Sequence, residues 1–220
     1  GSAWKGKHAL VFGTGASGHD VAQDLHTHGA QVSIVQRGST TVTSLEGSQV
    51  NHSLYAEDVP LEDSDMIAAA NTYPLLVRTY QLNVQKMIEI DKELLAGLTA
   101  VGFRHDQGED DTGHQMKLRR RGGGYYLNVG CSDLIIDGEI GLIQNADIER
   151  IVADGALLKD GHVQKADLIV TASGYLPPQE LVREMLGNEI AERVGPIWGI
   201  ASDGEMNNMY RRTAQKGLWF

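Results

Sequence analysis

The chain has little cysteine, few aromatic residues and no long apolar run. Its single cysteine, Cys131, cannot form a disulfide within the chain, and no grouping of Cys and His has the spacing of a zinc site. No apolar run approaches the roughly 20 residues that span a bilayer, and no signal-peptide core is visible. We therefore expect no membrane span, no metal site, a buried apolar role for Cys131 and a reducing, cytoplasmic setting.

Positive charge is also scarce. The chain has 19 Lys and Arg against 29 Asp and Glu, which gives a formal net charge of −10. A protein that binds a nucleic-acid duplex needs a basic face to displace counterions from phosphate. The one basic cluster, Lys117 with Arg119–Arg121, precedes three glycines and is predicted to lie in a solvated, Gly-rich loop over residues 106–124. We therefore expect no nucleic-acid partner.

Glycine, by contrast, is abundant, with 26 residues. An apolar, β-prone run at His8–Phe12 ends at the first glycine of a cluster. The apolar period after the cluster predicts a helix over Ser17–His28, stopped by Gly29, and Ala30–Gln36 then predicts a second strand. A strand, a turn, a helix and a strand in this order are typical of the first unit of a doubly wound parallel sheet.

Residues 13–18 read Gly-Thr-Gly-Ala-Ser-Gly and match G-x-G-x-x-G between that strand and that helix. Gly13 permits the tight turn, Gly15 lets a pyrophosphate approach the backbone, and Gly18 lets the helix pack on the sheet. The helix N-terminus offers N–H groups to phosphate, and Ser17 is placed either to cap the helix or to touch a phosphate. The alternative is a Gly-rich turn without a ligand.

The end of the second strand selects the cofactor. An acidic residue about 20 positions beyond the glycines would bind the adenosine ribose of NAD and repel a 2′-phosphate. Arg37 stands there instead and offers a bidentate fork to phosphate, with Ser39 and Thr40 as further hydroxyl donors, so NADPH is favoured. The alternative is that Arg37 is only a surface cation.

A second small-residue segment follows a late strand. Asp167–Thr171 is a nearly continuous apolar run, which predicts a strand buried on both faces. It ends in Ala172-Ser173-Gly174, at the strand end where open α/β sheets bind ligands, although a simple strand-ending turn is the alternative. The predicted cofactor-binding residues are Gly13, Thr14, Gly15, Ala16, Ser17, Gly18, Arg37, Ser173 and Gly174.

The middle of the chain predicts a helical insertion and a β-meander. Residues 38–62 lack a clear period and are predicted as a loop with short pieces. A short helix around Asp65–Ala70 and a long amphipathic helix over Leu75–Leu98 form an insertion at about residues 62–102. Asp-Gly pairs at 154–155 and 160–161 favour type I′ hairpin turns. The predicted short strands are Tyr125–Val129, Ile140–Gln144, Asp147–Val152, Ala156–Leu158 and His162–Gln164.

The segment WKGKHALVFGTGASGHDVAQDL followed by VSIVQR resembles the second, NADPH-binding fingerprint of flavin-containing monooxygenases. Within that family, the chain resembles the bacterial and fungal proteins that are similar to plant YUCCA enzymes. The segments GGGYYLNVGCSDLIIDGEI, DLIVTASGY and NMYRRTAQKGLWF are similar to later parts of that group. The resemblance implies that NADPH reduces FAD, which then uses O₂ to oxygenate a small organic substrate.

The match is position by position at the NADPH motif. Gly13, Gly15, Gly18 and Arg37 fit it, whereas Ala16 stands where Asn is common. Ser173 stands where the family usually has Thr, a change that keeps a hydroxyl.

The resemblance also implies an earlier G-x-G-x-x-G for FAD, which this sequence lacks. We therefore expect residues 3–220 to be an NADPH-binding domain, with the FAD-binding domain absent and the chain alone inactive. Apolar residues from Ala172 to Tyr175 and from Gly217 to Phe220, which the missing FAD domain would cover, are expected to favour self-association. The alternatives are an NADPH-dependent flavoprotein reductase without oxygenation and a non-catalytic nucleotide-binding module. No catalytic residue is identified.

We predict that the chain binds NADPH more tightly than NADH, because Arg37 replaces the acidic residue that would select NADH. Each tenfold preference corresponds to about 1.4 kcal/mol of binding free energy. Isothermal titration calorimetry of the purified chain with each nucleotide measures the preference. Equal affinities for the two nucleotides would contradict the cofactor assignment.

Overall fold

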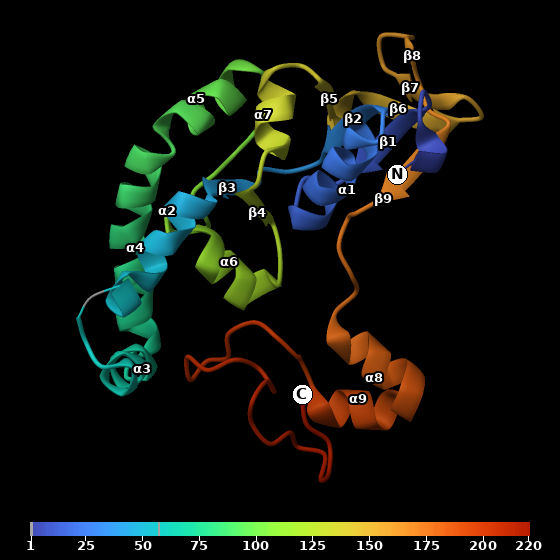
Figure 1. The fold of residues 1–220 in the computed structure, drawn as a ribbon. Coiled ribbons are helices and arrows are strands. Elements are labelled where there is room, and N and C mark those ends of the chain that lie inside the picture. The colour runs from blue at the N-terminus through green and yellow to red at the C-terminus, as the bar shows by residue number, and fades with distance from the viewer. Residues whose placement is uncertain (1, 57) are drawn as a thin grey trace.

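A four-stranded parallel sheet forms the centre of the fold (Figure 1). The computed structural model describes residues 2–56 and 58–220. Neighbouring strands are all parallel and follow the order β5-β2-β1-β9. They span Ile140–Gln144 (β5), Gln31–Gln36 (β2), His8–Phe12 (β1) and Leu168–Thr171 (β9). The predicted mixed α/β class with a parallel central sheet is therefore confirmed.

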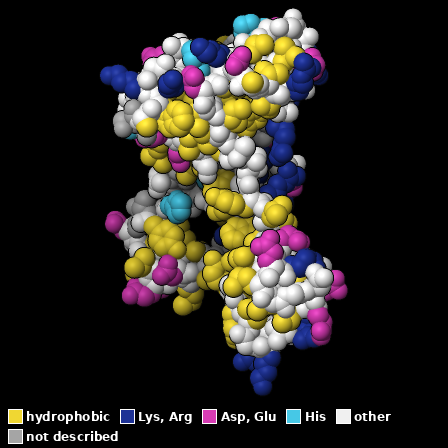
Figure 2. All heavy atoms as spheres, turned by 90° about the vertical axis from the view of Figure 1, so that its right-hand side faces the viewer, with side chains coloured by type: hydrophobic (Ala, Val, Ile, Leu, Met, Phe, Trp, Pro, Cys, Tyr) yellow, Lys and Arg dark blue, Asp and Glu magenta, His cyan; other side chains and the backbone are white. Residues whose placement is uncertain are grey.

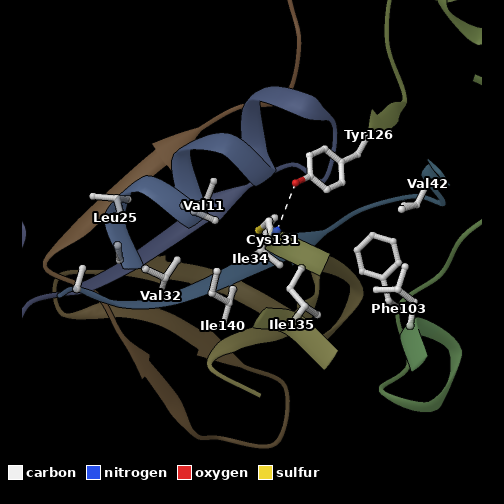
Figure 3. Packing of buried hydrophobic residues seen from close by; sticks show 14 residues of the cluster. Val11, Leu25, Val32, Ile34, Val42, Phe103, Tyr126, Cys131, Ile135 and Ile140 are labelled. Atoms are coloured by element: carbon white, nitrogen blue, oxygen red, sulfur yellow. Dashed lines mark hydrogen bonds between the residues drawn. The ribbon is translucent and has the colours of Figure 1, made fainter. Parts of the chain in front are cut away.

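Two helices cover one face of this sheet. Helix α1 (Ala16–Thr27) follows the predicted apolar period and buries Ala22 and Leu25. Gly29, with a φ of +86°, adopts the left-handed conformation that glycine reaches without strain after a helix. Helix α7 (Cys131–Ile136) lies beside α1, and Figure 3 shows both helices packing over the apolar side chains of β1, β2 and β5.

The predicted helical block is present, but its long helix is broken. Its helices are α3 (Leu61–Ala69), α4 (Tyr73–Ile90) and α5 (Lys92–Ala100). The single helix predicted over Leu75–Leu98 is wrong, because the chain changes direction at Asp91. The Asp91 carboxylate accepts hydrogen bonds from the Thr43 hydroxyl at 2.6 Å and the Ser44 amide at 3.0 Å. A long-range polar contact therefore outweighs the continuous apolar period.

The region 38–62 contains more regular structure than predicted. Strand β3 (Thr41–Ser44) pairs in parallel with β4 (Tyr125–Asn128) in a separate two-stranded sheet. Helix α2 (Leu45–Gln49) and the 3-10 helix Val50–Ala56 follow it. Residue 57 lies outside the described residues. The predicted short pieces are therefore present, but they are regular elements, held by β4 and α4, which are distant in sequence.

The predicted loop over 106–124 is also wrong, because helix α6 (Gly113–Arg121) occupies its centre. The helix has little apolar character, but its cations pair with acids of the preceding loop. The pairs are Lys117 with Asp106, Arg120 with Asp110 and Arg121 with Glu109. Basic residues in the last turn also suit the negative end of the helix dipole. The basic cluster is thus largely neutralised within the fold.

The predicted meander is confirmed. Strands β6 (Ile148–Val152), β7 (Gly155–Leu158) and β8 (Val163–Lys165) form an antiparallel sheet, preceded by the 3-10 helix Asn145–Asp147. In both Asp-Gly pairs only the glycine has positive φ, so neither turn is the predicted type I′.

Strand β9 is an edge strand in this sheet. The predicted strand is present, but its predicted burial on both faces is wrong. Within the described residues it pairs only with β1, and its residues alternate between half-buried and exposed, with Ile169 exposed by 39%.

The C-terminal part contains α8 (Pro178–Leu186) and α9 (Asn188–Val194). The Trp198 indole donates to the Leu118 carbonyl at 2.7 Å, which connects the segment after α9 to helix α6. Tyr175 is fully exposed and Trp219 is 57% exposed, whereas Phe220 packs on a small apolar cluster formed by α8 and α9. Figure 2, which views the right-hand side of Figure 1, shows hydrophobic side chains gathered across the middle of that face. The expected self-association stays a prediction.

Within the described residues, no helix combines the length and the apolar character needed to cross a bilayer.

Asp106 binds four donor groups through one carboxylate. It accepts hydrogen bonds from the hydroxyls of Ser39 and Thr41, from the Gly108 amide and from Lys117 at 2.7 Å. Partial burial alone would raise the pKa of Asp106, but the four donors outweigh it and lower this pKa well below its usual range. The carboxylate therefore fixes the turn after β2 against α6.

We predict that Asp106→Asn lowers the free energy of unfolding at pH 7 by about 1–3 kcal/mol, because an ion pair and charge-assisted hydrogen bonds are lost. The folded pKa is lowered, so the stability from Asp106 is present above its unfolded pKa of about 4 and is lost as the pH falls further. Urea unfolding measures the free energy of unfolding of variant and wild type at pH 7 and at pH 3. The difference between the two proteins should be smaller at pH 3.

The matched control is Asp111→Asn, which removes an exposed carboxylate from the same loop. It should leave stability unchanged. If Asp106→Asn lowers the free energy of unfolding by the same amount at both pH values, the role given to the ionised carboxylate is contradicted.

Candidate functional site

The predicted site residues meet at one edge of the central sheet. Because the four strands are parallel, their carboxyl ends lie at the same edge. This edge carries Gly13 after β1, Arg37 after β2 and Ala172 after β9. The connection from β1 runs to β2 on one side, while β9 lies on the other side of β1. Such a reversal of strand order opens the crevice in which open α/β sheets bind ligands.

Two glycines of the turn are required by close contacts within the fold. A Cβ on Gly13 would lie 2.3 Å from the Ala172 carbonyl oxygen, and the φ of Gly13 is +120°. A Cβ on Gly18 would lie 2.0 Å from the Gly13 carbonyl oxygen. Any side chain at these positions would separate α1 from the turn or the turn from β9. These contacts agree with the roles predicted for both glycines.

Gly15 is different, because the fold does not require glycine there. Its φ is −79°, and a Cβ would meet only the Tyr125 carbonyl oxygen, at 3.8 Å. The space beside Gly15 is therefore open, and it lies at the N-cap of α1, where no side chain caps the helix. The first N–H groups of a helix lack intrahelical acceptors. A pyrophosphate fits this arrangement of open space, donors and positive dipole end.

The other residues of the turn divide into buried and exposed ones. Ala16 and Ser17 are exposed, and the Ser17 hydroxyl does not cap the helix, so that alternative is wrong. Thr14 is buried, and its hydroxyl lies 2.7 Å from that of Thr40. Thr14 thus stabilises the turn from its buried side. The Thr40 hydroxyl, predicted as a phosphate donor, is already engaged in this hydrogen bond within the protein.

Arg37 presents an exposed guanidinium at the end of β2. Among the described residues, none forms a hydrogen bond or ion pair with it. The Arg104 guanidinium donates to the Arg37 carbonyl at 2.9 Å, so a second exposed cation stands beside the first. The Ser39 hydroxyl, predicted as a phosphate donor, donates to Asp106 instead.

Arg104 was missed in the sequence because no local pattern links it to β2. Its backbone is held there by Gln36, whose side chain is fully buried. The Gln36 carboxamide donates to the Arg104 carbonyl at 2.8 Å and accepts from the Arg104 amide at 2.9 Å. A buried glutamine that pairs with a backbone in this way has no signature in a single sequence.

The segment after β9 completes this edge. Ser173 and Gly174 are exposed, and Gly174 has a φ of +96° with nothing near the place of a Cβ. Ala172 touches Gly13, so this segment lies directly beside the glycine turn. The structure therefore brings the three predicted groups, the turn, Arg37 and residues 173–174, to one edge of the sheet.

Two buried titratable groups, Cys131 and His114, are poorly placed for chemistry. Burial raises the pKa of the Cys131 thiol to about 12, so it is not a thiolate nucleophile. Burial, with a smaller contribution from His52, lowers the pKa of His114 to about 4. Within residues 2–56 and 58–220, no cluster of three or more His, Cys, Asp or Glu could hold a metal ion.

No protein-family model matches the chain, and no curated protein matches its sequence. Solved structures do match its fold. A cyclohexanone monooxygenase bound to ε-caprolactone has a TM-score of 0.50 and 13% identity over 80% of this chain and 41% of that chain. An oxidised steroid monooxygenase bound to NADP has a TM-score of 0.50 and 15% identity over 82% and 41%.

A further structure, OTEMO in complex with FAD and NADP, has a TM-score of 0.52 and 13% identity over 83% of this chain and 41% of that chain. The chain thus spans about two fifths of the length of these proteins. Identities this low establish a shared fold and nothing finer. The chain therefore has a mixed α/β fold that is also found in part of several monooxygenases.

Proposed function

We propose that this chain binds NADPH at residues 13–18 and forms the nicotinamide-cofactor-binding part of an FAD-dependent monooxygenase that acts on a small organic substrate. The sequence resemblance at residues 4–25 and 32–37 supports a member of the YUCCA-like group. The likeness in fold to monooxygenases solved with NADP agrees with the proposal.

The observation that carries the proposal is the contrast between the three glycines of the turn. Gly13 and Gly18 are explained by contacts within the protein, whereas Gly15 has open space beside it at a helix N-terminus. A turn that served only the fold would tolerate a side chain at Gly15. The absence of one leaves room for a group that needs backbone N–H donors, and a dinucleotide pyrophosphate is such a group.

The charges at the end of β2 support NADPH over NADH. The guanidinium of Arg37 is exposed and unengaged by the described residues, and that of Arg104 is anchored beside it. Two cations at this place favour a 2′-phosphate, whereas NADH would leave them without a counter-charge. Bound NADPH supplies a hydride. The described residues bind and orient the dinucleotide, and none of them is assigned to the hydride transfer itself.

We place the flavin on residues outside this sequence. The described residues contain one glycine turn of this kind, and the chain spans about 41% of the neighbouring monooxygenases. A preparation that also contains the flavin-binding part tests the reaction. Oxygenation predicts substrate-dependent NADPH consumption with label from ¹⁸O₂ in the product. NADPH oxidation without incorporated label would instead identify a flavoprotein reductase.

We predict that Gly15→Val raises the dissociation constant for NADPH by about a hundredfold, or ~2.7 kcal/mol, because the side chain fills the place of the pyrophosphate. The variant should fold normally, since φ is −79° and no atom lies closer than 3.8 Å to the new Cβ. Calorimetric titration measures binding, and thermal unfolding followed by circular dichroism measures folding.

Two variants serve as controls. Gly123→Val adds the same side chain where no atom lies within 4 Å, and it should change neither binding nor folding. Gly18→Ala should lower the melting temperature sharply, because its Cβ would lie 2.0 Å from the Gly13 carbonyl oxygen. Wild-type affinity for NADPH in Gly15→Val would contradict the proposed site.

A further inference from the structure

His19 is a fully buried imidazole in the first turns of α1. Its ring Nδ1 lies 3.1 Å from the Gly15 carbonyl oxygen, and its backbone N–H donates to the same oxygen at 3.1 Å. Because a carbonyl oxygen can only accept, Nδ1 carries the proton and donates it. In the neutral form of the ring, Nε2 is then the unprotonated nitrogen.

Aromatic neighbours fix the orientation of this ring. Tyr126 stacks on it with centroids 3.9 Å apart and planes within 6° of parallel, and Phe103 lies 5.8 Å away. The Tyr126 hydroxyl accepts from the amides of Val129 and Cys131, which holds Tyr126 in turn. Figure 3 shows the hydrogen bond to Cys131. The imidazole cannot turn away from Gly15 without disturbing the core.

The environment also keeps the ring neutral. Burial lowers the pKa of His19 to about 4, against which the hydrogen bonds to Gly15 and Thr14 act only partly. The buried Nε2 has no hydrogen-bond partner among the described residues. A proton there would leave a buried cationic N–H without an acceptor. At neutral pH the ring therefore offers a single donor, aimed at Gly15.

The Gly15 carbonyl belongs to the same planar peptide unit as the Ala16 N–H. In a trans peptide the C=O and N–H bonds point in opposite directions. The two His19 donors that hold the Gly15 carbonyl oxygen therefore also fix the direction of the Ala16 N–H. The Ala16 N–H is one of the first amides of α1, which have no intrahelical acceptor, and it adjoins the open space beside Gly15. Two donors from one residue therefore set the direction of a phosphate-binding amide.

We propose that His19 is a positioning residue for the dinucleotide site, and that its Nδ1–H holds the Gly15–Ala16 peptide in the orientation that binds the cofactor pyrophosphate. The inference rests on the proposed function and adds to it a residue that touches no cofactor atom. Thr14 stabilises the turn through its hydrogen bond with Thr40, and His19 stabilises it while stacked on Tyr126. The turn is thus supported on both sides of Gly15.

Two amide variants separate the donor from the bulk of the ring. In His19→Asn the side-chain NH₂ occupies the position of Nδ1 and can donate to the Gly15 carbonyl. In His19→Gln the NH₂ reaches the position of Nε2 instead, although glutamine is closer to histidine in volume. Thermal unfolding verifies that both variants are folded, and any difference between them then reports the position of one donor.

We expect His19→Asn to bind NADPH within about threefold of wild type and His19→Gln to bind about tenfold more weakly, as measured by calorimetry. Hydrogen–deuterium exchange without nucleotide should be faster at residues 15–18 in His19→Gln and unchanged in His19→Asn. Wild-type affinity and exchange in His19→Gln, or equal losses in both variants, would overturn the inference.

The same experiment distinguishes the two proposals. If the wild-type chain binds no NADPH, the proposed function fails. The exchange measurement still decides whether His19 holds the turn, because it needs no ligand. If the wild type binds and the two variants do not differ in either measurement, the proposed function stands and the role of His19 fails.

Discussion

The site depends on one contact between backbones. Gly18 of α1 lies so close to the Gly13 carbonyl that a methyl group would approach within 2.0 Å, and Gly13 in turn lies against Ala172. Helix α1, the end of β1 and the end of β9 therefore share one place that admits no side chain. Close packing there brings the N-terminus of α1 to the carboxyl edge of the sheet. The supports described for Gly15 are useful only because this contact has already fixed the turn.

A second constraint places the positive charge. Arg37 and Arg104 stand side by side because the buried Gln36 carboxamide pairs with the backbone of residue 104. Asp106, two residues further on, ties Ser39 and Lys117 together in the fold. The acidic neighbour is thus neutralised by its own lysine, while the two arginines keep their charge for a ligand. The separation of paired and unpaired ions leaves two exposed cations at this end of the sheet, which supports the proposed binding of a phosphate group.

The sequence was most informative where local patterns and tertiary structure agree. The first β-α-β unit, the meander and the roles of Gly13 and Gly18 follow from periodicity and from glycine geometry. The prediction failed where distant polar contacts decide: Asp91 breaks a helix because it turns to Thr43, and α6 forms because Lys117 and Arg120 find acids. A C-terminal signal for α6 was present, since three arginines precede Gly122, whose φ is +69°. His19 and Arg104 could not be found, because burial and long-range pairing leave no local trace.

The pairing of β1 with β9 also bears on how the chain folds. The hydrogen bond from the His8 amide to Asp167 joins residues 159 positions apart. Strand β1 therefore cannot complete its pairing until β9, near the end of the chain, is in place. Contacts of such high sequence separation carry a large loop-closure entropy and slow folding. During synthesis from the N-terminus, α1 and β2 can dock on β1 early, but the Ala172 side of the glycine turn arrives only after β9. The crevice beside the glycine turn is therefore assembled late, and until then β1 has an open sheet edge.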